Sequence, residues 1–354
     1  MTSKTPGVSR RHFLAKGATV AAGAAALAAP ATIASASTPI NLRLQTAYPV
    51  GTWHYDSVVV DLADRVRAAT AGEINIEVFP TGAIVPTLEM FTAAGRGLLD
   101  AAFIFPGNWI GQVPSAGHLA GNVGTFDSLE EAWYFYYETE ALSIIQEAYA
   151  ERGVHLVGPV ASSGLTFFGK RPIRTLADFR GNRIRSSGNA QRVFERMGSS
   201  PVTVPGAELF HALQTGVVET AHWGGVSAGM NIGFGEVTAF IMKPDIVYPY
   251  NMEVFFSQRR WNSLGEDHRQ IITDVVRAIP SAHYHPKNLY YETVDTNRFI
   301  NDHGGEVVHM EDEVLELMRV SSMQIVDEIS AADPRYSGRV GQLLHEFMRF
   351  TGKI

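Results

Sequence analysis

The sequence predicts an α/β protein with two lobes. Short apolar strand patterns alternate with helical patterns through most of the chain, and this repeated β–α–β order favours α/β layers with a largely parallel sheet. Behind the first 36 residues, about 318 of the 354 residues remain, which is more than one core usually takes. Because the chain crosses more than once between the two sets of elements, we expect a ligand cleft between lobes that can close.

The first set of elements begins with a strand pattern at residues 40–48. A helix follows, with Leu62, Val66 and Ala69 on its apolar side, and Gly72 ends it. The later elements of this set are a strand at 73–80, a helix at 87–99, a strand at 100–105, a helix at 128–152 and a buried strand at 153–160. The helix at 128–152 carries a stripe of aromatic residues, which we expect to serve packing.

The second set of elements occupies residues 165–223. A further strand at 253–257 precedes a long helical region at 264–301, which Pro280 or Pro286 should kink. The predicted lobe boundaries are 37–161 plus 252–285 for lobe I, and 162–251 plus 286–354 for lobe II with the C-terminal helices.

The beginning of the chain predicts an export signal. Arg10 and Arg11 form a twin-arginine pair, an apolar run follows at 18–29, and Ala34 and Ala36 satisfy the small-x-small cleavage rule. The run of about a dozen residues is short for a membrane span, which needs about 20. We therefore predict a twin-arginine signal peptide at 1–36 and a mature chain that is placed in the periplasm without membrane insertion.

Composition excludes several classes of function. The sequence has no cysteine, which rules out disulfides, thiolate chemistry and iron–sulfur clusters. Loss of the four basic residues of the signal would lower the formal charge from −7 to −11. An acidic chain without a basic tract argues against nucleic acid and against anionic membrane surfaces as partners. We expect no cofactor.

Arg185 is the first candidate binding residue. It ends a strand pattern around Ile184, and a Ser-Ser-Gly-Asn turn at 186–189 leads into a helix. The turn adds hydroxyl groups, free N–H groups and the positive end of that helix. A guanidinium matches a carboxylate bidentately and stays charged, and its burial without a partner is costly. Arg185 should therefore face an anion, which is either a bound ligand or an Asp or Glu of the other lobe.

Two longer stretches resemble a known family. "PIRTLADFRGNRIR" at 172–185 and "MGSSPVTVPGAELFHALQTGVVETAHWGG" at 197–225 closely resemble the solute-binding proteins of tripartite ATP-independent periplasmic (TRAP) transporters. The likeness covers nearly all of the predicted mature chain, including "FPTGAIVPTLEMFTAAGRGLLDAAF" at 79–103. The positions that match the family pattern are Pro172, Asp178, Gly181, Arg185, Met197, Gly198, Gly206, Glu208, Ala212, Leu213 and Gly216.

The resemblance implies a receptor with defined partners. In that family the arginine matching Arg185 holds the carboxylate of a small organic acid. Two α/β lobes close over the ligand, and a long helix spans both of them, a role that the segment 264–301 would fill. The closed receptor would dock on small and large integral-membrane TRAP subunits.

Within the family, the likeness is greatest to proteins that bind 2-oxo and 2-hydroxy monocarboxylates. Some of them hold a metal ion beside the substrate, at positions that match Ala161, His222 and Glu253. Alanine cannot coordinate, and a hard cation wants several oxygens, so we expect no metal requirement. His222 could hold a transition metal, donate to an oxygen of the ligand or pair with Glu253, and the pair is the expectation.

Other residues are candidate pocket walls. Trp109 matches an aromatic residue that the family places near the cleft, and Asn108 beside it is a candidate polar contact. Tyr48 and Trp53 follow the first strand. Phe167 lies on the crossing into the second lobe, where a core position is the competing interpretation. The complete predicted substrate-binding set is Arg185, Trp223, His222, Glu253, Asn108, Trp109, Tyr48, Trp53 and Phe167, with no catalytic and no metal-binding residue. Aromatic walls would favour a ligand with an apolar or aromatic tail.

Two alternative functions remain at this point. His222 and Glu253 beside a carboxylate-binding arginine would suit an enzyme that abstracts a proton next to a carbonyl, although the sequence has no nucleophile motif, nucleotide loop or His-Glu-x-x-His box. The chain could also present its ligand to a sensor. The "HYH" run at 283–285 is expected to be helix surface rather than a metal site.

Overall fold

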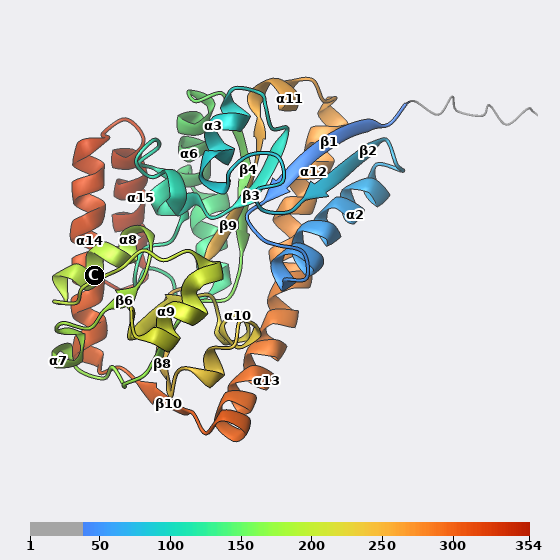
Figure 1. Cartoon of the computed structure of the whole chain (residues 1–354). Coiled ribbons are helices and arrows are strands. Elements are labelled where there is room, and N and C mark those ends of the chain that lie inside the picture. The colour runs from blue at the N-terminus through green and yellow to red at the C-terminus, as the bar shows by residue number, and fades with distance from the viewer. Residues whose placement is uncertain (1–37) are drawn as a thin grey trace, which may run out of the picture. The chain divides into compact units, whose positions relative to one another are not determined.

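Two five-stranded β-sheets organise residues 38–354, the part of the chain that the computed structural model describes (Figure 1). In sheet order, the first contains β2 (Ile74–Phe79), β1 (Ile40–Thr46), β3 (Ala101–Ile104), β9 (Asn251–Ser257) and β4 (Val154–Ala161). The second contains β10 (Glu306–His309), β8 (Phe240–Val247), β5 (Leu165–Gly169), β7 (Thr220–Trp223) and β6 (Ile184–Arg185). The predicted signal peptide lies outside the described residues.

The α/β prediction is confirmed, but the sheets are mixed rather than largely parallel. In the first sheet β1 runs parallel to β2 and β3, whereas β9 is antiparallel to both β3 and β4. In the second sheet β5 is antiparallel to β7 and β8. The reason lies in the connections. A strand that arrives directly from the other sheet, as β5 and β9 do, does not pass through the helical crossover that a parallel neighbour requires.

Helices cover both sheets. They are α2 (Val60–Ala69), α3 (Met90–Gly95), α4 (Ala116–Leu119), α5 (Leu129–Trp133), α6 (Ala141–Ala150), α7 (Leu176–Phe179), α8 (Gly188–Arg196), α9 (Leu209–Thr215), α10 (Val226–Asn231), α11 (Gln258–Asn262), α12 (Glu266–Ile279), α13 (His285–His303), α14 (Asp312–Ala332) and α15 (Ser337–Phe350). Among the described residues, no helix is long and apolar enough to cross a membrane.

The two long predicted helices are both interrupted. Residues 128–152 form α5, a π-helical turn at Tyr134–Glu138 and α6, and Thr139 separates the last two with an extended backbone. Its hydroxyl accepts a hydrogen bond from the amide of Ala141 and so replaces a missing partner at the start of α6. The helical region after Leu264 bends where Pro280 removes a backbone donor, in a π-helical turn at Pro280–Tyr284 between α12 and α13.

Three segments connect the two sheets. The first links β4 to β5, the second links β8 to β9, and the third is the turn between α12 and α13. The first two are hydrogen-bonded to each other, because the amide of Ser162 donates to the carbonyl of Tyr250 at 2.7 Å and the amide of Tyr250 donates to Ser163 at 2.9 Å. The helices α14 and α15 link the two halves as well, because side chains of α14 belong to the cores of both.

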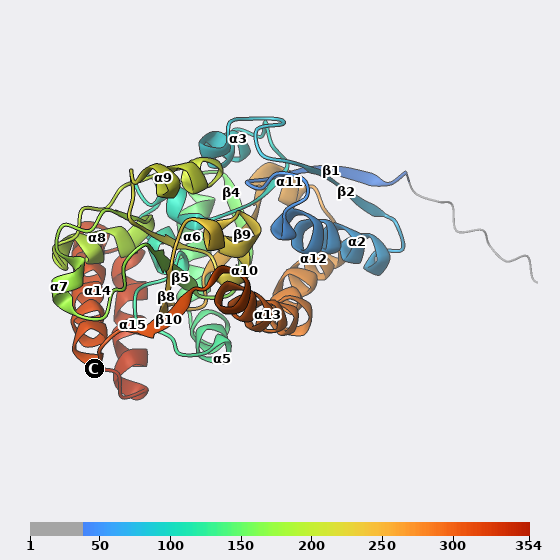
Figure 2. The ribbon, with the colours of Figure 1, turned by 60° about the horizontal axis from the view of Figure 1, so that its bottom comes forward.

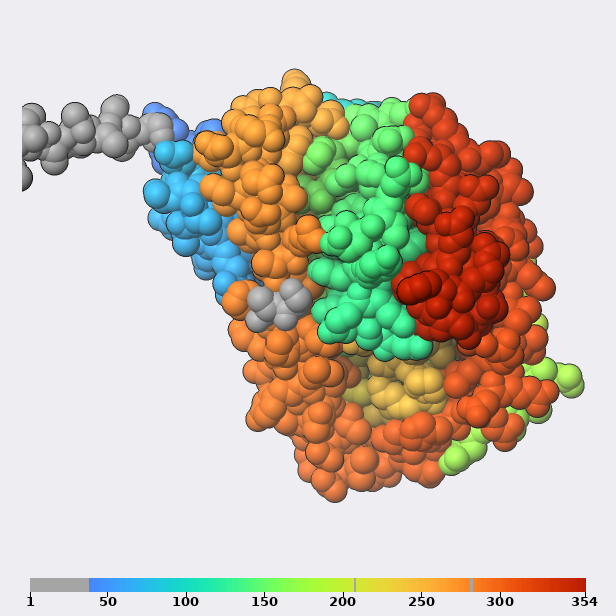
Figure 3. Space-filling model, turned by 180° about the vertical axis from the view of Figure 1, so that it is seen from behind, coloured from blue at the N-terminus to red at the C-terminus, as the bar shows by residue number. Residues whose placement is uncertain are grey.

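The helices after Leu264 join both halves. α12 packs on β4 and α2, while α13 packs on α10 and β10, and Figures 1 and 2 show α13 continuing from α12 to lie beside α10. The C-terminal helix α15 packs against α6 (Figure 3). Its residues Val340, Leu344 and Phe347 belong to a core shared with helices of the first sheet, whereas the predicted boundaries placed 286–354 wholly in lobe II.

Candidate binding site

Arg185 is fixed at an edge of the second sheet. Ile184 of β6 is fully buried, and β6 pairs in parallel with β7, where Arg185 lies opposite Ala221. On its other side Arg185 forms a bridge to Val202. The arginine is only 9% exposed. The sheet, rather than a loose loop, therefore sets the position of its backbone.

The guanidinium of Arg185 is held by neutral groups. Its Nε donates to the carbonyl of Val204 at 3.1 Å, and its Nη1 donates to the carbonyl of His222 at 3.1 Å. The group lies 4.5 Å from the centre of the Trp223 ring, which gives a cation–π contact. Among residues 38–354, no Asp or Glu forms an ion pair with Arg185. The salt bridge that the sequence left open is therefore not formed within this part of the chain.

Arg185 keeps its charge at neutral pH. Burial lowers the pKa of the guanidinium to about 10, and the hydroxyls of Tyr250 and Tyr48 act in the opposite direction. A buried cation without a counter-ion is unfavourable, and an anion placed beside it would remove much of that cost. The electrostatics of the site thus favour a negatively charged guest.

Four hydroxyl groups lie together near this arginine, and we call Tyr48, Tyr250, Tyr284 and Ser162 the hydroxyl cluster. The Oγ of Ser162 is 2.8 Å from the Oη of Tyr284. Burial raises the pKa of Tyr250 to about 12, while Tyr48 and the charge of Arg185 lower it. Tyr48 follows β1, and the other three residues come from the three connecting segments. The cluster therefore forms only when both sheets are in place.

Two predicted aromatic residues lie in the same region. The ring of Tyr48 stacks on His54, with centroids 4.2 Å apart, and Trp53 lies 4.1 Å from Tyr284. The Nε2 of His54 is 3.2 Å from the Oη of Tyr284. Burial lowers the pKa of His54 to about 4, so this imidazole is neutral in the physiological range. It adds hydrogen-bonding capacity without charge.

Sequence reasoning missed Tyr250, Tyr284 and Ser162. Tyr284 belongs to the "HYH" run that was expected to be helix surface, yet it is only 3% exposed. The signal that could have revealed these residues is their place next to chain crossings, since a cleft between two lobes is bordered by the segments that join them.

Two predicted pocket walls, Trp109 and Phe167, lie in the cores. Trp109 is 1% exposed, stacks on Phe91 in the first core and donates to the Oη of Tyr149 at 2.9 Å. Asn108 beside it is exposed to solvent. Phe167 is fully buried in the second sheet's core, where its ring centroid lies 5.2 Å from that of Phe194. This agrees with the interpretation of Phe167 as a core residue. The structure therefore uses Trp109 and Phe167 for packing and not as pocket walls beside the hydroxyl cluster.

The expected pair of His222 and Glu253 is wrong. Strand alternation points Glu253 of β9 toward α6, where its carboxylate accepts a hydrogen bond from Tyr149 at 2.8 Å. His222 of β7 lies between Phe167 and Phe194, and its Nδ1 is 3.2 Å from the Oγ of Ser186. Burial and then the charge of Arg185 lower the pKa of His222 to about 3. The enzyme alternative, which needs these two groups side by side, loses its acid–base pair.

The residues present do not fit a metal ion. The side chain of Ala161 offers no ligand atom, the carbonyl of His222 accepts from Arg185, and one carboxylate oxygen of Glu253 accepts from Tyr149. The other carboxylate oxygen of Glu253 and the Nε2 of His222 are buried without a hydrogen-bond partner, but two such atoms fall short of the several oxygens that a hard cation wants. In the described part of the chain, no three His, Asp or Glu residues gather in a metal-binding arrangement.

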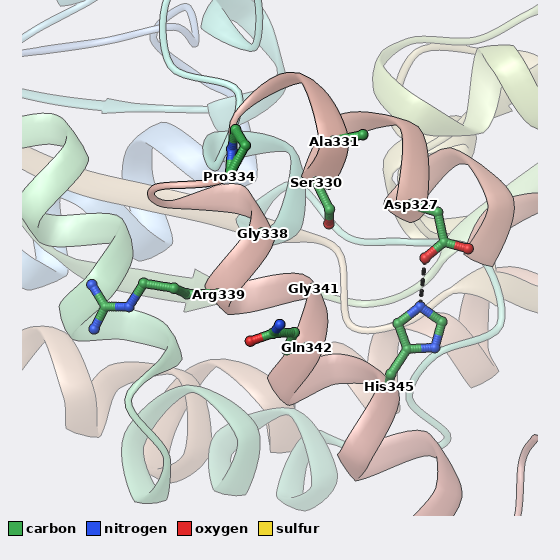
Figure 4. Close-up of a pocket in the computed structure, with 9 residues that line it drawn as sticks. All are labelled: Asp327, Ser330, Ala331, Pro334, Gly338, Arg339, Gly341, Gln342 and His345. Carbon is green, nitrogen blue, oxygen red and sulfur yellow. Dashed lines mark hydrogen bonds and ion pairs between the residues drawn. The ribbon is translucent and has the colours of Figure 1, made fainter.

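Two surface cavities are unconnected to Arg185. One, of about 320 Å³, lies between α14 and α15, where the Nε2 of His345 is 2.7 Å from Asp327 (Figure 4). The other, of about 440 Å³, lies between the end of α2 and the start of α12. Neither is lined by Arg185, Trp223 or a member of the hydroxyl cluster.

Comparisons with known proteins agree on one family and one fold. Residues 45–333 match the family model described as bacterial extracellular solute-binding protein, family 7. A curated relative, the monocarboxylate 2-oxoacid-binding periplasmic protein all3028 of Nostoc sp., is 26% identical over 237 residues, which cover 66% of this chain and 64% of the relative. The chain thus spans less than two thirds of the length of the curated relatives it matches.

Two solved structures share the fold. A TRAP periplasmic solute-binding protein of Pseudoalteromonas atlantica with bound sodium and pyruvate has a TM-score of 0.81 and 16% identity, and the match covers 89% of this chain and 96% of that one. A TRAP solute-binding protein of Bordetella bronchiseptica with calcium and picolinate has a TM-score of 0.79 and 18% identity, with 90% and 94% covered. At these identities the likeness establishes the fold alone.

Proposed function

Because this chain belongs to the bacterial extracellular solute-binding proteins of family 7, we propose that it is the periplasmic receptor of a TRAP transporter and that it captures a small organic monocarboxylate. The observation that carries this proposal is the buried, positively charged Arg185 with no carboxylate partner among the described residues. Its guanidinium would hold the carboxylate of the ligand bidentately, and Trp223 would support it from one side.

The charge of the site supports a ligand with one negative charge. Arg185 supplies a single positive charge, whereas His54 and His222 are neutral because burial lowers the pKa of each, to about 4 and about 3 respectively. Lys243 is paired with Asp245 at 2.8 Å. A second carboxylate on the ligand would therefore lack a cation of its own.

The hydroxyl cluster supports a ligand with a polar atom beside its carboxylate. Tyr48 and Tyr250 both interact electrostatically with Arg185, so a carboxylate on Arg185 would place its neighbouring carbon near their hydroxyls. An oxo or hydroxyl group at that carbon could accept or donate there. The rings of Tyr48, Trp53 and Tyr284 would suit an apolar or aromatic remainder. Pyruvate and picolinate, found in the two structural neighbours, both have this form.

The remaining parts of the proposal concern the route and the partners. The lobes would be 37–161 with 252–285 and 162–251 with 286–354, except that α15 packs with the first of them, and they would close about the three connecting segments. The closed receptor would deliver its ligand to small and large membrane subunits, after export through the twin-arginine pathway. Genes for these subunits next to the gene for this chain would support uptake, whereas a neighbouring sensor kinase would favour signalling.

A thermal-shift screen of the chain from Ser37 tests the proposal. Pyruvate, lactate, 4-methyl-2-oxopentanoate and picolinate are compared with amines and neutral sugars of similar size. A compound at 100 times its dissociation constant should stabilise the protein by about 2.7 kcal/mol. Stabilisation by monocarboxylates alone is the expected result, and stabilisation by the amines or sugars alone would contradict the proposal.

Removal of the Tyr250 hydroxyl should weaken the binding of 2-oxo acids but not the binding of acids without the oxo group. Tyr250→Phe should weaken binding of a 2-oxo acid by about 0.5–1.5 kcal/mol, the net value of one hydrogen bond. Binding of the matching acid without the oxo group should be unchanged in calorimetry. Equal losses of affinity for both acids would show that the hydroxyl does not contact the oxo group.

Chelation should leave binding intact. Because the residues near Arg185 do not fit a cation, EDTA treatment and exchange of Na⁺ for K⁺ should leave the dissociation constant of the best monocarboxylate unchanged in calorimetry. Full recovery of a lost affinity on adding Ca²⁺ or Na⁺ would contradict this expectation.

A further inference from the structure

One half-buried carboxylate outside the site, that of Glu292, joins the spanning helix to it. Glu292 of α13 accepts hydrogen bonds from the amides of Val226, at 2.6 Å, and Ser227, at 3.2 Å. These amides open α10, directly behind the turn that follows β7. A carboxylate from one element thus satisfies the free N–H groups of another.

The turn between Trp223 and α10 is built around this carboxylate. A Cβ at Gly225 would collide with the Glu292 carboxylate and the Oγ of Ser163 in their present positions, so it would displace the carboxylate from the turn. The carbonyl of Gly224 accepts from the amide of Thr166 at 2.9 Å. The turn is therefore held from β5 on one side and from α13 on the other.

We propose that Glu292 is a positioning residue for the binding site, because its carboxylate locks the Gly224–Gly225 turn, and with it Trp223, to the helix that joins the two sheets. Trp223 stacks on the guanidinium of Arg185, and the carbonyl of the preceding His222 accepts from it. A loose turn would loosen both contacts. The expected effect of Glu292 on ligand affinity rests on the proposed function, whereas its expected effect on the turn does not.

The electrostatic surroundings make this contact sensitive to pH. The charged groups that face Glu292 are Asp245 and Lys243 of β8, and Tyr284 lies near it, while α10 carries no titratable side chain. Burial and then Asp245 raise the pKa of Glu292 to about 7, although Lys243 and the two amides lower it. The ionised form, present above that pH, is the better acceptor. Ligand binding favours the fixed turn, so by linkage affinity should fall as pH drops below about 7.

Glu292→Gln keeps the size of the side chain and removes its charge, and Glu313→Gln on the exposed face of α14 is the matched control. Two measurements are made on both variants and the wild type. Amide hydrogen exchange of residues 224–231, without ligand, reports on the turn. Calorimetry from pH 5.5 to 8.5 with pyruvate, 4-methyl-2-oxopentanoate and picolinate as probes reports on the site.

We expect Glu292→Gln to speed amide exchange at Val226 and Ser227. It should also weaken binding of the probe about three- to tenfold at pH 8, which is the scale expected when a charged hydrogen bond is replaced by a neutral one. Its affinity should also lose the pH dependence of the wild type. Unchanged exchange would overturn the lock, and faster exchange with unchanged affinity would overturn the positioning role. If no probe binds the wild type, the proposed ligand class fails, while the exchange data still decide whether Glu292 holds the turn.

Discussion

Arg185→Lys is expected to weaken monocarboxylate binding by about 10- to 150-fold, which corresponds to about 1.5–3 kcal/mol. Lysine keeps the positive charge but loses the planar fork that can hold a carboxylate with two parallel hydrogen bonds. It also loses the donors to the carbonyls of Val204 and His222 and the flat stack on Trp223. Calorimetry with the best acid from the screen measures the change.

Arg183→Lys is the control for this variant. Arg183 stands two residues earlier in the chain, but its exposed side chain donates to the carbonyls of Val217 and Gly216 on the surface. Its replacement should leave the dissociation constant unchanged. Equal affinity of the Arg185→Lys variant and the wild type would remove the basis of the proposed site.

Dicarboxylates are expected to bind at least about 100-fold more weakly than monocarboxylates of the same length. The second carboxylate would enter a region where His54 is neutral, because burial lowers its pKa to about 4, and where Lys243 is already paired with Asp245. Burial of an unpaired carboxylate costs several kcal/mol, and a loss of about 2.7 kcal/mol is enough to raise the dissociation constant 100-fold. A comparison of 2-oxopentanoate with 2-oxoglutarate in competition calorimetry measures the ratio.

A ligand analogue can distinguish this effect of charge from exclusion of the longer ligand by size. The monoamide of 2-oxoglutarate at its distal carboxyl has the same length as the dicarboxylate and carries one negative charge, beside the oxo group. It should recover most of the affinity of 2-oxopentanoate if charge is the cause. Preference for 2-oxoglutarate over both compounds would mean that another cation serves the site.

The α/β architecture and the place of Arg185 could be predicted from the sequence because both depend on local patterns. Ile184, the 186–189 turn and the following helical pattern are contiguous, and together they place an arginine at the end of a strand. The kink at Pro280 is local as well, since it follows from the missing backbone donor.

Features that depend on how the chain comes back from the second sheet to the first could not be predicted in the same way. Strand β9 has the apolar pattern of a buried strand, which does not distinguish parallel from antiparallel pairing. Its direction is set by its arrival from the second sheet, and this in turn points Glu253 toward Tyr149 rather than His222. Local sequence contains no information on that choice.

The hydroxyl cluster escaped prediction for a related reason. Ser162 and Tyr284 are 122 positions apart in the chain, yet their hydroxyls are 2.8 Å from each other. Trp109 shows the converse, because an aromatic residue just after a strand can turn toward the cleft or toward the core, and Phe91 and Tyr149 provide the better-packed surroundings. Packing between distant segments, not local pattern, decided both.

The most direct measurement is a crystal structure of the protein with the best monocarboxylate from the screen. We predict that both carboxylate oxygens lie about 3 Å from guanidinium nitrogens of Arg185, that Trp223 remains stacked on that group, and that the tail of the acid points toward Tyr48, Tyr250 and Tyr284. A carboxylate bound at Lys243 or at a surface cavity, with Arg185 still engaged only by Val204, His222 and Trp223, would contradict the proposed role of this arginine.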